Sequence, residues 1–251
     1  KIKIRMIENF AVVIYTHTDC QDVYEVFFKQ LEKHFNITCK KYICINDDFR
    51  GLVPKDIPNE YNLLLYPSSI PYASKLSYCL SKVEESTILY LHEDMILYDN
   101  IDETEFIKYI KYIQSQDRDS FIKLIKGGEK RDIPHESIST LKRIPIDSEW
   151  IFSVQPSIWK KNKLRFLCAS LSNCDIYQLE NLSQKFCREN GIEGNYSYQG
   201  EPERGGHYDC KVFPYIATAI VRGKWNTKEY AKELIPILEE HGIDKNIRGE
   251  F

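Results

Sequence analysis

Short apolar runs alternate with amphipathic helical patterns over the first 95 residues of the chain. Four mainly apolar runs have the length of buried strands and lie at residues 10–15, 41–46, 61–66 and 87–92. Between them, apolar residues recur every three or four positions at residues 21–35 and 73–83, which is the spacing of one helix face. Strands that alternate with helices predict a parallel sheet, because each helix returns the chain to the edge from which the next strand starts.

The second half of the chain has a less regular pattern, which predicts mixed structure. Helices are expected at residues 102–114, 157–167, 175–190 and 226–241. Strands are expected at residues 120–125, 138–144, 149–154 and 212–221. The first two of these strands lie on either side of Gly127 and Gly128 and have the pattern of a hairpin. Residues 194–207 are polar and contain glycine, as is typical of a loop.

Composition is that of an ordinary globular protein. The 251 residues are 43% hydrophobic and 28% charged, which predicts a single domain over residues 8–251. Lys and Arg number 34 against 37 Asp and Glu, so no excess of positive charge is available for nucleic-acid binding. No apolar run approaches the roughly 20 residues of a membrane helix, and residues 1–9 carry charges where a signal peptide is apolar. We therefore expect no transmembrane segment, no nucleic-acid partner and a cytoplasmic location.

The eight cysteines show no spacing typical of a zinc site. No two of them form a Cys-x-x-Cys pair, and most fall within expected strands or helices. Free, buried thiols in a reducing compartment are therefore expected.

An acidic motif directly follows the fourth apolar run. Here His92, Glu93 and Asp94 stand at the expected carboxyl end of a strand. Ligands of open parallel sheets bind beyond this edge, where two successive carboxylates can hold Mg²⁺ or Mn²⁺ together with substrate phosphates. The alternative is that the pair only forms a turn. The chain contains no Walker P-loop, G-x-G-x-x-G, H-E-x-x-H or G-x-S-x-G motif.

Polar residues also follow the first two expected strands. Thr16 and His17 come after the first strand, and Asp47 comes after the second. Hydroxyl and carboxylate groups are suited to hydrogen bonds with a nucleoside base and ribose, and Thr16 is the preferred nucleotide contact. The same residue types are common in turns, so a purely structural role stays open.

The order of motifs along the chain resembles that of GT-A nucleotide-sugar glycosyltransferases. The acidic motif precedes a Gln-Pro-x-x-Trp segment at residues 155–159 and a Gly-Lys-Trp segment at residues 223–225. The pattern is similar in particular to small enzymes of large algal viruses, related to the capsid-glycosylating transferases of chloroviruses, and to bacterial sugar transferases. The resemblance extends over residues 10–226.

This resemblance implies an α/β fold of the GT-A, Rossmann-like kind, with a mostly parallel central sheet flanked by helices and a mixed C-terminal half. Residues 8–95 would form the nucleotide-binding half of the single domain. Residues 96–225 would form the donor-sugar and acceptor half, and residues 226–251 a closing helix.

The acidic motif occupies the place of the Asp-x-Asp motif of that family, with His92 where the family has its first Asp. The resemblance implies that Asp94 is a metal ligand and that Glu93 is a second ligand or a ribose contact. The implied cofactor is Mn²⁺ or Mg²⁺, which would neutralise the negative charge that develops as a nucleoside diphosphate leaves the sugar.

The resemblance also implies roles for four residues outside the acidic motif. Lys75 would reach the nucleotide, and Gln155 would bond hydroxyls of the donor sugar. His207 would complete the metal shell, and Lys224 would bind the diphosphate. The structural alternatives are solvated lysines and an exposed loop histidine.

An inverting transferase also needs a carboxylate base within reach of the attacking hydroxyl. The candidates are Asp175 and Glu180, near the start of the expected 175–190 helix. Five residues correspond to about 140° around a helix, so the two side chains should not face one cleft together. The spacing from Tyr177 to Glu180 resembles the aromatic-x-x-Glu pattern of the family and favours Glu180.

These features predict a metal-dependent glycosyltransferase that moves a hexose from a nucleoside-diphosphate sugar, with UDP favoured, to a glycan or glycoprotein acceptor, with inversion. One alternative is a sugar nucleotidyltransferase, but that reaction calls for a glycine-rich basic loop after the first strand, and residues 16–20 lack Gly and Lys. The other alternative is a catalytically inactive domain that binds a carbohydrate or a nucleotide, which His92 keeps open.

Overall fold

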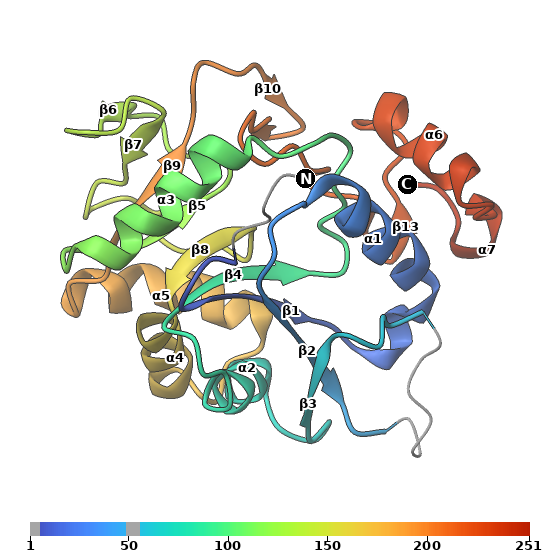
Figure 1. Cartoon of the computed structure of the whole chain (residues 1–251), viewed down its shortest axis with the longest axis horizontal. Coiled ribbons are helices and arrows are strands. Elements are labelled where there is room, and N and C mark those ends of the chain that lie inside the picture. The colour runs from blue at the N-terminus through green and yellow to red at the C-terminus, as the bar shows by residue number, and fades with distance from the viewer. Residues whose placement is uncertain (1–5, 49–55) are drawn as a thin grey trace.

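A large mixed sheet forms the centre of the protein (Figure 1). The computed structural model describes residues 6–48 and 56–251. Within these residues the sheet has nine strands in the order β3-β2-β1-β4-β8-β5-β9-β7-β6. Parallel pairing joins its first four strands, which are β1 (Phe10–Tyr15), β2 (Lys40–Asn46), β3 (Asn62–Tyr66) and β4 (Thr87–His92).

The sheet becomes mixed beyond β4. There β8 (Ser157–Lys160) runs antiparallel to both of its neighbours, β4 and β5 (Asp119–Lys123). Next to β5, β9 (Glu193–Ser197) is parallel to β5 and antiparallel to β7 (Leu141–Arg143), which pairs with β6 (Ile133–Pro134). The fold is therefore an α/β fold with a mostly parallel central sheet and a mixed second half, as the sequence predicts.

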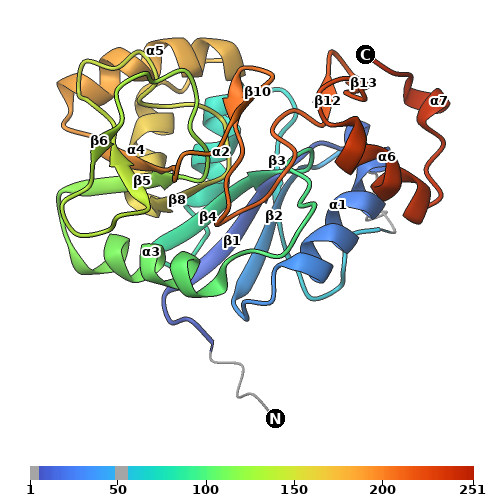
Figure 2. The same ribbon diagram turned by 90° about the horizontal axis from the view of Figure 1, so that it is seen from above.

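Helices cover both faces of this sheet (Figures 1 and 2). One layer contains α1 (Gln21–His34) and α3 (Glu103–Ser115), and the other contains α2 (Tyr72–Leu80), α4 (Lys161–Ser170) and α5 (Ile176–Glu189). Residues of β1 alternate between the two layers: Val12 packs in the core under α1 and α3, whereas Val13 packs in the core under α2 and α4. Because both faces are covered, β1 is apolar at every position.

The C-terminal segment returns to the N-terminal half of the sheet. In Figure 1, α6 (Ala231–Glu240) lies beside α1, and α7 (Lys245–Arg248) follows it. A separate apolar cluster joins Val23 and Val26 of α1 to Trp225 and Leu234. This segment includes a hairpin of β12 (Ile220–Val221) and β13 (Lys224–Trp225). An earlier hairpin is formed by β10 (Glu203–Arg204) and β11 (His207–Tyr208).

The cysteines and the helix lengths can be compared with the sequence. All eight cysteines are free thiols, and six of them are buried. Among the residues that the structure describes, no helix combines the length and the apolar character that a membrane crossing needs.

The predicted elements of the first 95 residues are confirmed. Both β1 and β4 have the predicted bounds, while β2 begins one residue before the predicted start and β3 begins one residue after it. In the second half, the helices at residues 103–115 and 176–189 are also confirmed, and Asp102 caps the first of them.

Other predictions for the second half were wrong. Residues 157–160 form β8 rather than the start of a helix, because Ile158 and Trp159 pack in opposite layers of the core. Residues 120–125 and 138–144 do not form a hairpin, since β9 lies between β5 and β7, and residues 194–197 belong to β9 rather than to a loop. Residues 149–154 and 212–219 contain no strand, and the helix expected from residue 226 begins at Ala231.

Candidate active site

The carboxyl ends of β1, β2 and β4 meet at one edge of the sheet. The register pairs Tyr15 with Cys44 on one side and with His92 on the other. The polar residues that follow these strands are therefore neighbours, as the parallel arrangement requires. This edge is where open α/β sheets bind their ligands.

The acidic pair Glu93 and Asp94 lies at this edge, partly buried. Burial raises the pKa of both carboxyl groups, and the negative charge of Asp94 raises the pKa of Glu93 further. A hydrogen bond from the side chain of Cys20 partly offsets the shift at Glu93, and the positive charge of Arg248 does the same at Asp94. The fold therefore holds two adjacent carboxyl groups whose ionised forms are disfavoured by burial.

The described structure does not group His207 with this pair, and its role as a metal ligand stays a prediction. Within residues 6–48 and 56–251, no three His, Cys, Asp or Glu side chains are grouped closely enough to hold a metal ion together. His207 lies in β11, where its Nδ1 is 3.3 Å from the carbonyl oxygen of Gly205. A cation at Glu93 and Asp94 would thus take its remaining ligands from substrate oxygens and water, which is the usual arrangement for Mg²⁺ bound with phosphates.

His92, which replaces the first acid of the motif, is held by tyrosines. Its Nε2 is 2.8 Å from the hydroxyl of Tyr72 and also contacts the hydroxyl of Tyr90. Burial lowers the pKa of His92 to about 3, so the imidazole is neutral at physiological pH. This histidine therefore packs and bonds at the edge of the sheet as a neutral side chain and adds no positive charge there.

The two residues after β1 make hydrogen bonds within the protein. Thr16 is buried; its hydroxyl donates to the hydroxyl of Tyr24 at 3.0 Å, and its carbonyl accepts from Tyr66 at 2.6 Å. His17 precedes the short helix η1 (Thr18–Cys20), and its Nδ1 accepts from the backbone N–H of Asp19 at 3.2 Å. His17 thus has the turn-forming contact that the sequence left as the alternative, whereas Thr16 is held by bonds with α1 and β3.

The residues near the ends of β2 and β3 are better placed for a ligand. Asp47 is exposed immediately after β2. Beside it, the fully buried Asn46 bonds both the backbone N–H and the hydroxyl of Thr18, at 2.8 and 2.9 Å. The ammonium of Lys75 lies 5.2 Å from the ring centroid of Tyr66, at the end of β3. The sequence did not single out Asn46, whose role depends on its pairing with Thr18 across the edge.

A cavity of about 180 Å³ joins three of the predicted site residues. Asp94 comes from the end of β4, Gln155 from the loop before β8, and Glu180 from α5. Gln155 accepts a hydrogen bond at Oε1 from the hydroxyl of Tyr215, which leaves its NH₂ group as a donor. Glu180 accepts at Oε1 from the backbone N–H of Val154 at 2.6 Å. The fold thus brings a candidate metal ligand, a candidate sugar contact and a candidate base to one cavity.

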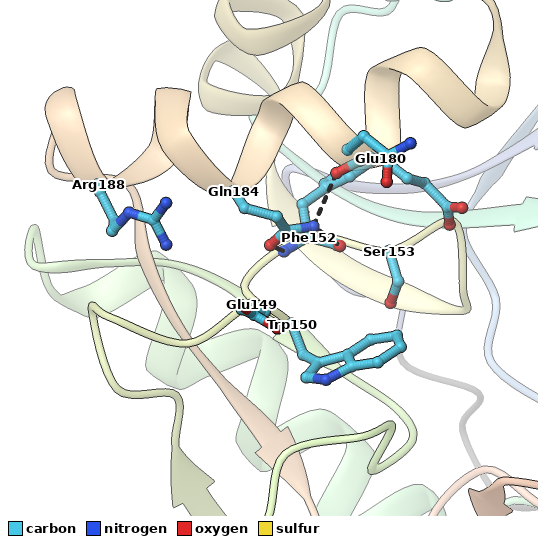
Figure 3. A pocket seen from close by; sticks show the side chains of 8 residues that line it. Glu149, Trp150, Phe152, Ser153, Glu180, Gln184 and Arg188 are labelled. Atoms are coloured by element: carbon cyan, nitrogen blue, oxygen red, sulfur yellow. Dashed lines mark hydrogen bonds between the residues drawn. The ribbon is translucent and has the colours of Figure 1, made fainter.

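Glu180 also lines a second, larger cavity of about 550 Å³ (Figure 3). In Figure 3, α5 presents Glu180, Gln184 and Arg188 along one side, and the loop that carries Glu149, Trp150 and Ser153 faces it. The side chain of Glu180 is therefore shared by the two cavities.

The other predicted site residues line neither cavity, and Asp175 and Lys224 are two of them. Asp175 is an exposed N-cap of α5: its Oδ1 accepts from the backbone N–H of Gln178 at 2.8 Å, and the side chain of Gln178 bonds back to Asp175. The capping box gives Asp175 a structural role, and its role as a base stays a prediction. Lys224 is exposed in β13, where its side chain is close to Gly249.

Two basic residues near the site were missed. Arg248 forms an ion pair with Asp22, donates from Nη1 to the carbonyl of Gly223 at 3.1 Å, and acts electrostatically on Asp94. Lys123 is buried at the end of β5, and burial lowers its pKa to about 8. An acidic or glycine-rich motif flanks neither residue, so the sequence carried no signal for them.

Comparison with known proteins gives a likeness of fold only. No protein-family model matches the chain, and no curated protein matches it. A nucleotidyl transferase from Methanothermobacter thermautotroptrophicus is 11% identical, with a TM-score of 0.49, over 77% of this chain and 88% of the other.

Two further solved structures are similar to this degree. The 4-diphosphocytidyl-2C-methyl-D-erythritol synthase of Anaerococcus prevotii is 10% identical, with a TM-score of 0.46, over 75% of this chain and 86% of the other. A CMP:2-keto-3-deoxy-manno-octonic acid synthetase in complex with CTP is 11% identical, with a TM-score of 0.46, over 76% of this chain and 89% of the other.

Proposed function

We propose that the protein is a metal-dependent transferase that binds a nucleoside-diphosphate sugar at the carboxyl edge of β1, β2 and β4 and passes its hexose to a glycan or glycoprotein. The observation that carries the proposal is the single cavity lined by Asp94, Gln155 and Glu180. These residues come from separate elements and have the three chemical capacities that glycosyl transfer needs.

The acidic pair fits a divalent cation by its donor set. Glu93 and Asp94 offer hard carboxylate oxygens at a sheet edge, and Mg²⁺ or Mn²⁺ is commonly held by one or two carboxylates together with substrate phosphates. A cation bound there would stabilise the charge of the departing nucleoside diphosphate. Asp47 and Lys75, near the ends of β2 and β3, are the candidates for contacts with the nucleoside part.

Glu180 is the proposed base. The N–H of Val154 fixes one carboxylate oxygen, and the other can take the proton of an acceptor hydroxyl. As that hydroxyl oxygen bonds to the anomeric carbon, the bond from this carbon to the diphosphate oxygen breaks, and the configuration inverts. The NH₂ group of Gln155 would donate to a hydroxyl of the donor sugar in the same cavity.

Sugar nucleotidyl transfer is the second candidate, because the acidic pair would serve a nucleoside triphosphate equally well. That reaction would join a nucleotide to a sugar phosphate and release pyrophosphate. It gives Glu180 no function, since a sugar phosphate is already ionised and needs no base.

The released products distinguish these reactions. The protein is incubated with Mn²⁺ and a panel of UDP-, GDP- and dTDP-sugars, and separately with nucleoside triphosphates and sugar 1-phosphates. Release of a nucleoside diphosphate supports the proposal, whereas release of pyrophosphate supports nucleotidyl transfer. Binding with neither product would identify an inactive binding domain.

A pair of variants tests the assigned base. Glu180→Gln should lower the turnover by about 10²–10⁴-fold while leaving nucleotide binding intact. Glu189→Gln is the matched control, because Glu189 lies on the same helix, is 60% exposed and pairs only with Lys185. Equal activity of Glu180→Gln and the wild type would contradict the assignment.

A further inference from the structure

The larger of the two cavities has an exposed tryptophan in its wall. Trp150 is 46% exposed and lines the cavity, whereas Trp159 and Trp225 are each 1% exposed. The other two indoles are buried in the core, whereas this one is exposed in a concave site. An exposed indole in such a place is typical of a ligand-binding surface.

Trp150 is held in place before any ligand binds. A Cβ atom at Gly128 would lie 2.3 Å from the indole, so the ring packs directly on the backbone of that glycine. The backbone N–H of Trp150 donates to Ser148 Oγ at 2.9 Å, and its carbonyl accepts from the buried ammonium of Lys123. The ring is thus covered by backbone at Gly128 while much of its surface stays exposed in the cavity.

The remaining wall is polar and nearly balanced in charge. Glu149 and Arg188 carry opposite charges, and Asn181 and Gln184 add neutral amides. The side-chain amide of Gln184 is fixed by two bonds to the backbone of Phe152, at 3.1 and 2.6 Å. With Glu180 included, carboxylates outnumber cations, so the cavity does not suit a phosphate or a nucleotide. An aromatic surface beside donors and acceptors suits the C–H face and the hydroxyls of a neutral sugar.

We infer that this cavity binds a neutral sugar unit of the acceptor, with Trp150 as its stacking surface. The inference rests on the proposed function, because Glu180 lines both cavities and would take the proton of a hydroxyl that reaches it from this side. The donor would then approach Glu180 from the side of Asp94, and the acceptor from the side of Trp150.

The test uses an array of neutral mono- to tetrasaccharides, probed with the full chain in saturating Mn²⁺ and UDP. The saccharide that binds best is then titrated while tryptophan emission is followed, since Trp150 is the exposed indole among the three tryptophans. We expect a saturable change in emission. Trp150→Ala should weaken binding about tenfold or more, and Trp150→Phe should recover part of it.

A matched control is Phe166→Ala. Phe166 is also 46% exposed but lies on α4, away from the cavity lining, and its removal should leave saccharide binding unchanged. Calorimetry with Mn²⁺ and UDP separates the two proposals, because Trp150→Ala should bind UDP as the wild type does. If UDP binds but no saccharide does, or if Trp150→Ala binds saccharide normally, the acceptor site is wrong. If UDP does not bind the wild type, the proposed function itself fails.

Discussion

Glu93 and Asp94 are adjacent carboxylates in a site that penalises their charge. Burial raises the pKa of both, so the ionised pair is less favourable in the folded protein than in the unfolded chain. The metal-free protein therefore loses stability as the pH rises through these raised pKa values. A bound cation would reverse this cost, which links the stability of the site to its proposed function.

Asp94→Asn should therefore stabilise the metal-free protein and abolish its metal-dependent nucleotide binding. At pH 8 we expect a gain on the order of 1 kcal/mol, or roughly 2–4 °C in Tm, by scanning calorimetry. The gain should disappear below pH 3.5, where the carboxyl is protonated in the wild type as well. Asp99→Asn is the control, because Asp99 is an exposed carboxylate of the same loop. A lower Tm, or Mn²⁺-dependent UDP binding that survives in Asp94→Asn, would contradict the assignment.

Strands that are buried on both faces were predictable, and strands that are built around polar groups were not. β1 and β4 are continuous apolar runs whose length and composition mark them as central strands. In contrast, β9 contains Asn195, which is fully buried and donates to the carboxylate of Asp119 at 2.8 Å. This bond gives the buried NH₂ group of Asn195 a partner on another strand that is far away in the sequence, so no local pattern in the sequence indicates it.

Gly194 shows how β9 is fitted to its neighbour β5. A Cβ atom at Gly194 would lie 2.5 Å from the ring of Phe121, which stacks on Trp159 with centroids 4.3 Å apart. Gly194→Ala should cost about 1–3 kcal/mol, because the ring cannot withdraw from the core. Thermal denaturation would measure the change, with Gly127→Ala as a near-neutral control, since the closest atom to its added Cβ is 4.0 Å away. Equal stability of the two variants would show that β9 can shift.

Asp175 belongs to α5 as a structural element. Asp175→Ala should lower the unfolding free energy by about 1 kcal/mol through loss of the capping box, while Asp175→Asn should retain most of it. Turnover per folded molecule should stay unchanged in both variants, unlike that of Glu180→Gln. A drop in turnover of two orders of magnitude without loss of stability would return Asp175 to the role of base.

At the scale of the whole molecule, the site combines residues that the sequence could and could not identify. Asp94, Gln155 and Glu180 belong to motifs whose order along the chain was recognisable, and the fold brings them to one cavity. Arg248 was not recognisable, because it reaches the site only when α6 and α7 fold back onto α1 (Figure 1). Its ion pair with Asp22 fixes the end of the chain beside the N-terminal half of the sheet.

This return of the C-terminal segment makes the acidic pair depend on Arg248. The positive charge of Arg248 lowers the pKa of Asp94, so Arg248→Gln should raise it further. Asp94 would then ionise at higher pH, and the pH at which Mn²⁺-dependent UDP binding is half-maximal should move upward. A shift of about half a pH unit corresponds to roughly threefold in affinity on the acidic side of the profile.

Calorimetric titrations of UDP in Mn²⁺ from pH 5.5 to 8.5 would measure this shift. Lys33→Gln is the control, because Lys33 of α1 pairs with Glu240 of α6 at 2.9 Å and so ties the same segments together without acting on Asp94. If both variants weaken binding equally at every pH, the C-terminal segment affects UDP binding only through its packing on α1. If Arg248→Gln alone weakens binding by the same factor at every pH, Arg248 contacts the nucleotide directly and the electrostatic coupling is wrong. An upward shift confined to Arg248→Gln would establish that the last turn of the chain sets the ionisation of the site.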